Sequence, residues 1–124
     1  MQSPQELMEA LSQLPKEIHD LQMSILNLNE EETSLAADIS KAEAKIKSEI
    51  AAAVDANGKK LFSNAEMRDA ELVERSSSDL DLITLKSQHD SVKRKITEAR
   101  LEVELLNNQQ RNARTCLDFI GATA

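Results

Sequence analysis

The sequence predicts an all-α protein, folded as a long antiparallel coiled-coil helical hairpin that is able to assemble into a helical-bundle oligomer. Apolar residues recur at alternating steps of four and three, which is the spacing of a coiled-coil seam. Only 2 Gly and 2 Pro interrupt 124 residues, so few turns are available. Aromatic residues make up 2% of the chain, whereas ordinary compact cores depend on large aromatic side chains.

A first helix is predicted over about residues 4–56. Ser3 can cap its start, Pro4 suits the first helical position, and Glu6 completes a capping box. Pro15 lies inside the pattern, where it either kinks the helix or starts a new one after a short first segment. The seam of this helix consists of Leu7, Leu11, Leu14, Ile18, Leu21, Ile25, Leu28, Leu35, Ile39, Ala42, Ile46 and Ala53.

A loop over about residues 57–62 and a second helix over about 63–120 follow. Asn57 and Gly58 form the strongest stop signal of the chain, since glycine readily adopts the left-handed conformation that ends helices. Three consecutive serines predict a kink, stutter or break in the second helix at 76–78, and the segment from Ser78 to Asp81 can cap a fresh helix. The seam of this helix consists of Leu82, Leu85, His89, Val92, Ile96, Ala99, Val103, Leu106, Gln110, Ala113, Leu117 and Ile120.

The two seams share one register when they are folded against each other near residues 60–61. Most apolar positions then meet apolar positions, and Glu32 lies opposite His89, whereas Gln110 is unmatched and faces Leu11. This pair is interpreted as a polar layer that sets the register, because a buried polar residue can specify helix pairing at some cost in stability. The alternative is a pH switch, since a nearby carboxylate favours the protonated form of histidine.

Composition excludes several classes of function. The formal net charge of −7 argues against direct nucleic-acid binding, which needs a cationic surface. No apolar run is long enough to span a bilayer, and the N-terminus has no signal-peptide pattern. The single cysteine, Cys116, cannot form an internal disulfide, which favours a reduced, cytoplasmic setting. No cofactor, metal or catalytic motif is present, and a non-enzymatic protein is predicted.

The segment between the two helices is the candidate recognition site. This tip combines a loop with mixed charge, and its candidate contact residues are Lys59, Lys60, Phe62 and Arg68. Loops carry function more often than the helices that present them. The alternative is that Phe62 and its neighbour Leu61 simply close the end of the hairpin.

Residues 55–68 have the sequence DANGKKLFSNAEMR, which resembles a segment of small phage and prophage helical-hairpin proteins. In that family, whose members are largely uncharacterised, a turn of this kind joins two long helices. The resemblance extends over roughly residues 45–120 and carries no catalytic residues. It implies a helical accessory protein in the cytoplasm of a bacterium or of a phage-infected host cell.

The predicted function is therefore protein–protein interaction or a structural accessory role, with a protein partner and self-association into a homo-oligomer. An alternative is an acidic helical inhibitor that mimics DNA and occupies a nucleic-acid enzyme. That alternative needs a concentrated negative stripe, whereas 15 basic residues are interspersed among 22 acidic ones.

Overall fold

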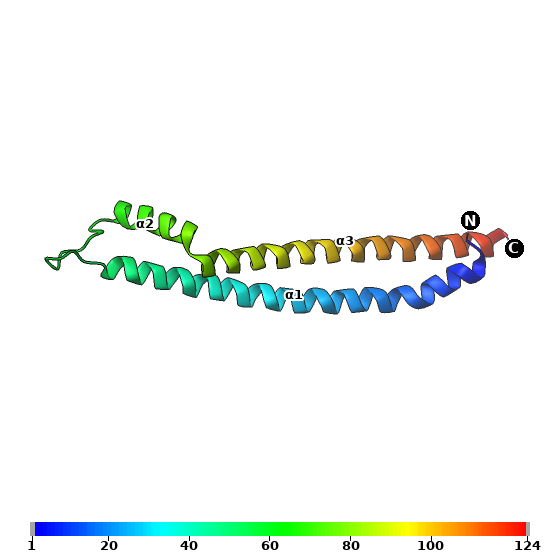
Figure 1. The fold of residues 1–124 in the computed structure, drawn as a ribbon. Helices are drawn as coiled ribbons and strands as arrows, with labels where there is room; N and C mark the ends of the chain where they lie inside the picture. The colour runs from blue at the N-terminus through cyan, green and yellow to red at the C-terminus, as the bar shows by residue number, and fades with distance from the viewer. Residues whose placement is uncertain (1, 124) are drawn as a thin grey trace. The chain divides into compact units, whose positions relative to one another are not determined.

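The computed structural model describes residues 2–123, which form three α-helices and no strand. They are α1 (Pro4–Ala52), α2 (Ala65–Ser78) and α3 (Leu80–Thr123), shown in Figure 1. The all-α prediction is confirmed. The chain divides into two compact units, each described by itself. The terminal unit joins the chain up to Glu30 to the chain from Lys93 onward, and the tip unit spans Glu31–Val92.

The start of α1 follows the predicted capping. The Ser3 side-chain oxygen accepts a hydrogen bond from the Glu6 backbone N–H at 3.2 Å, and the Ser3 carbonyl accepts one from the Leu7 N–H at 3.0 Å. The helical assignment continues through Pro15. Since proline has no N–H to donate to the preceding turn, a bend is the expected consequence. Figure 1 shows the first turns of α1, in blue, bending toward α3 within the terminal unit.

The terminal unit packs the first part of α1 against the last part of α3. Leu14, Ile18 and Leu106 form its buried cluster, with Leu21 and Val103 packed against it. Leu7, nearer the start of α1, lies with Cys116 in one cleft. Positions that advance along α1 therefore meet positions that go backward along α3, and the two segments are antiparallel.

The tip unit has its own cluster, formed by Ile46 and Ile50 of α1 and Leu82 of α3. Leu82 is 0% exposed and Ile50 is 2% exposed. Phe62 from the loop and Leu72 from α2 pack against these three side chains. In both units, every predicted seam position is buried or half-buried.

The first helix ends earlier than predicted, at Ala52 rather than near 56. The backbone leaves the helix because the next residues pair with the returning chain. The Ala53 carbonyl accepts a hydrogen bond from the Leu61 N–H at 3.0 Å, and Val54 forms an isolated antiparallel bridge with Lys60. The second helical stretch also begins later, at Ala65 rather than at 63.

The break in the second helical stretch lies at Asp79, one residue beyond the serines at 76–78 and inside the segment from Ser78 to Asp81 that was expected to cap a fresh helix. The serines remain helical, and the Ser77 and Ser78 hydroxyls donate to the Glu74 carbonyl. Asp79 serves both helices. Its N–H donates to the Arg75 carbonyl at the end of α2, and its side chain accepts from the Leu82 N–H at 2.9 Å at the start of α3. Helix α3 then extends to Thr123, beyond the predicted end at 120.

Candidate recognition site

The predicted tip is an ordered turn. Asp55 and Lys59 pair across it, with the Asp55 N–H donating to the Lys59 carbonyl at 2.8 Å. The Gly58 N–H donates to the Asp55 carbonyl at 3.0 Å, and Gly58 has φ +79°. A tight turn that ends on a left-handed glycine is a common three-residue hairpin loop. Asn57-Gly58 is therefore part of a hairpin turn, whereas a helix stop was predicted there.

The Asp55 carboxylate holds this turn from inside. Its Oδ1 accepts hydrogen bonds from the Asn57 N–H at 2.8 Å and from the Lys59 N–H at 3.0 Å. Aspartate at the first position of a turn commonly binds backbone N–H groups in this way. This role of Asp55 was not predicted, although an Asp three residues before a Gly is a recognisable signal for such a turn.

The four predicted tip residues divide into two pairs. Lys59 and Lys60 are exposed on the returning arm of the turn. Phe62 and Arg68 are half-buried, and the Arg68 Nη1 donates to the Phe62 carbonyl at 3.2 Å. The Arg75 guanidinium lies 5.7 Å from the centroid of the Phe62 ring. Phe62 and Arg68 thus pack at the base of the turn, and of the four predicted residues the two lysines are the exposed ones.

The two members of the predicted polar layer lie close together in the tip unit. His89 Nε2 lies 3.7 Å from Glu32 Oε1, with side-chain exposures of 21% and 32%. Both positions occupy the seam, between half-buried Leu35 and half-buried Leu85 on one side and buried Val92 on the other. A polar pair in a mainly apolar seam disfavours other registers of the two helices. It also buries less apolar surface than an apolar pair would.

Replacing His89 by leucine is expected to raise the free energy of unfolding by about 0.5 kcal/mol, since apolar surface is buried at position 89 while Glu32 keeps its contact with water. Urea unfolding followed by circular dichroism measures the change. The matched control is His19→Leu, at an exposed position of α1, where no gain is expected. A lower free energy of unfolding for His89→Leu would show that the Glu32–His89 pair stabilises the fold by more than the burial of polar groups costs.

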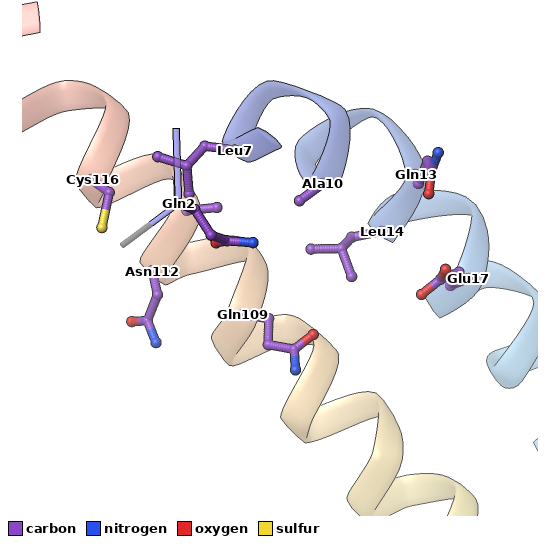
Figure 2. A pocket seen from close by; sticks show the side chains of 10 residues that line it. Gln2, Leu7, Ala10, Gln13, Leu14, Glu17, Gln109, Asn112 and Cys116 are labelled. Carbon is purple, nitrogen blue, oxygen red and sulfur yellow. The ribbon is translucent and has the colours of Figure 1, made fainter. Parts of the chain in front are cut away.

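Two adjoining clefts in the terminal unit were not predicted. Figure 2 shows the larger one, of about 460 Å³, between α1 side chains such as Leu14 and α3 side chains such as Gln109 and Cys116. The smaller, of about 310 Å³, has a mainly apolar lining that includes Leu7 and Phe119. Ala10 and Ala113, which line the larger cleft, are small side chains at the helix contact, and small residues leave such space.

Neither metal-binding groups nor known relatives indicate a further site among residues 2–123. Among residues 2–123, no group of three or more His, Cys, Asp or Glu side chains is placed to hold a metal ion. No helix in this range has an apolar stretch long enough to cross a membrane. Comparison with known proteins yields no matching family model, no matching curated protein and no matching solved structure.

Proposed function

We propose that this chain is a non-enzymatic coiled-coil protein that binds other proteins, including further copies of itself, through its helix surfaces and its tip. One observation carries the proposal. Besides the ten fully buried apolar side chains, twelve large apolar side chains are exposed among residues 2–122. The exposed set comprises Met8, Met23, Leu26, Val54, Leu61, Met67, Val73, Leu80, Ile83, Leu101, Leu105 and Phe119.

Single exposed apolar residues are normal on protein surfaces, whereas exposed apolar side chains that lie together form surfaces that bind partners. Fully burying a leucine or phenylalanine contributes roughly 1.5–3 kcal/mol. Several half-exposed side chains acting together would therefore support a stable complex. The resemblance of residues 55–68 to phage helical-hairpin proteins supports an accessory role of this kind.

The ordered tip supports a second contact with a partner. Lys59 and Lys60 are exposed on a turn whose backbone is fixed by Asp55 and Gly58. Two adjacent cations on a turn with a fixed backbone suit an acidic protein surface, since little backbone freedom has to be lost on binding.

The double variant Lys59→Glu/Lys60→Glu is expected to lose a partner that the wild-type chain retains in affinity capture from an extract of its source organism. The matched control, Lys41→Glu/Lys45→Glu, reverses two exposed lysines of α1 and should retain that partner. Quantitative mass spectrometry of the captured proteins measures the difference. Equal retention by both variants would exclude the tip. A wild-type chain that captures nothing and stays monomeric would exclude the proposed function.

Acidity alone does not favour the DNA-mimic alternative. The tip unit is the more acidic of the two, with 13 acidic and 8 basic residues between 31 and 92. Cations such as Lys86, which lies 3.6 Å from Glu43, break up the negative surface. The exposed apolar side chains have no role in that alternative, whereas the proposed function uses them.

A further inference from the structure

Asn57 is the only asparagine of the sequence that is followed by glycine. Asparagine is a thermolabile residue in proteins, because the backbone nitrogen of the next residue can attack its side-chain amide carbon. Glycine permits this attack most readily, since it has no Cβ to crowd the nitrogen and its backbone can adopt more conformations. Asn57 therefore combines a reactive neighbour with a position in the candidate recognition site.

The surroundings of Asn57 leave its side chain open to this reaction. The residue is exposed. Within the described part of the chain, Asn57 bonds to Asp55 through its backbone N–H and makes no hydrogen bond through its side-chain amide. At Gly58, no heavy atom beyond the neighbouring residues lies within 4 Å of the position that a Cβ would take. No other part of the tip thus shields the two reacting groups.

The other asparagines are held in ways that oppose the same reaction. Asn64 caps α2, where its Oδ1 accepts a hydrogen bond from the Met67 N–H at 2.9 Å, and alanine follows it. The remaining ones lie inside helices, where hydrogen bonds of the helix hold the backbone nitrogen that would attack. These are Asn27, Asn29, Asn107, Asn108 and Asn112. Asn64 is thus an internal control close to Asn57 in the sequence.

Asp55 restrains the reaction at Asn57. The Gly58 N–H has to lose its proton before the nitrogen attacks, and it donates to the Asp55 carbonyl at 3.0 Å. The Asp55 Oδ1 holds the N–H groups of Asn57 and Lys59 as well. The Gly58 nitrogen reaches the Asn57 side chain only after the backbone between them rotates, so the turn has to open first. The free energy of this local opening then sets the rate.

We propose that Asn57 is a site of spontaneous deamidation, at a rate set by the turn that Asp55 holds. The Gly58 nitrogen forms a bond to Asn57 Cγ and gives up its proton, and the side-chain amide group leaves as ammonia. Water then opens the resulting cyclic imide at either of its carbonyls, which leaves aspartate or isoaspartate at position 57. One water is consumed and one ammonia is released, and nothing is oxidised or reduced.

Both products change the surface that the tip presents. Residues 55–60 contain one acidic and two basic residues, a net charge of +1, and a new carboxylate at position 57 lowers this charge to 0. Isoaspartate also adds one backbone atom inside the loop that the hydrogen bonds between Asp55 and Lys59 close. The modified tip should therefore bind an acidic partner more weakly. This consequence rests on the proposed function, whereas the reaction itself does not.

Incubation of the full chain in water enriched in oxygen-18 tests the site. Because water opens the imide, position 57 should acquire one heavy oxygen as aspartate or isoaspartate, whereas Asn64 should stay unlabelled. Digestion in ordinary water, followed by peptide mapping with mass spectrometry, separates this label from changes caused by handling. Asn57→Gln, whose longer side chain would have to close a larger ring, should acquire at least tenfold less label. An Asn57 that remains as unlabelled as Asn64 would overturn the inference.

A second variant tests the control by the turn. Asp55→Ala removes the side-chain acceptor of two backbone N–H groups, so the label at Asn57 should appear at least threefold faster. The matched control, Asp38→Ala, removes an exposed carboxylate of α1 and should leave the rate unchanged. Equal rates in the two variants would contradict the role given to Asp55. Labelling of Asn57 in a chain that captures no partner would support this inference and count against the proposed function alone.

Discussion

Replacing Leu82 by alanine is expected to lower the free energy of unfolding by about 3 kcal/mol, within the range found for leucine side chains removed from packed cores. Leu82 is 0% exposed and lies in the cluster with Ile46 and Ile50. Its removal leaves a cavity that the two isoleucines cannot fill without moving α1. Urea unfolding followed by circular dichroism measures the loss.

The control for Leu82→Ala lies two residues away. Leu80 begins the same helix and is 77% exposed, so Leu80→Ala should change the free energy of unfolding by no more than about 0.5 kcal/mol. Two equal losses would contradict the inward direction of Leu82. Equal and negligible effects would show that α3 does not pack on α1 in the tip unit.

The Gly58→Ala variant is expected to lower the free energy of unfolding by about 1.5 kcal/mol. Gly58 has φ +79°, a conformation that costs an L-residue with a Cβ roughly 1–2 kcal/mol. No heavy atom lies within 4 Å of an added Cβ, so the loss would come from the backbone alone and not from a collision. Chemical unfolding of the variant measures it.

The second glycine of the chain provides the opposite control. Gly121 lies inside α3 and also has open space around an added Cβ. Because alanine favours a helix over glycine by up to about 1 kcal/mol, Gly121→Ala should be neutral or slightly stabilising. A destabilising Gly121→Ala or a neutral Gly58→Ala would contradict the backbone conformations described here.

The helical class and the buried faces of the helices could be predicted from the sequence, because they depend on the spacing of apolar residues. Leu14, Ile18 and Leu106 belong to the predicted seams and form one cluster. The facing of Glu32 and His89 followed from the same register. Periodicity determines which side of a helix is apolar, and an antiparallel partner with the same period then has few registers available.

The ends of the helices and the structure of the tip could be predicted less well from the sequence, because they depend on contacts between segments. Asn57-Gly58 can end a helix or close a hairpin, and the hydrogen bond between Ala53 and Leu61 decides between them. Phe62 was expected as an exposed or end-closing residue. It packs half-buried against Ile46, Ile50 and Leu82, and the Arg75 guanidinium lies 5.7 Å from the centroid of its ring. Such pairings have no periodic signal in the sequence.

The division into two units has a consequence for the order of folding. Ile50 and Leu82 of the tip cluster are 32 residues apart in sequence, whereas Leu14 and Leu106 of the terminal cluster are 92 apart. The entropy of loop closure grows with the logarithm of loop length, so closing the longer loop first costs about 1 kcal/mol more. We therefore expect the tip unit to nucleate folding. Once its helices pair, pairing can extend step by step along the helices toward the termini. Mutations such as Leu82→Ala should therefore slow folding more than changes near Leu14.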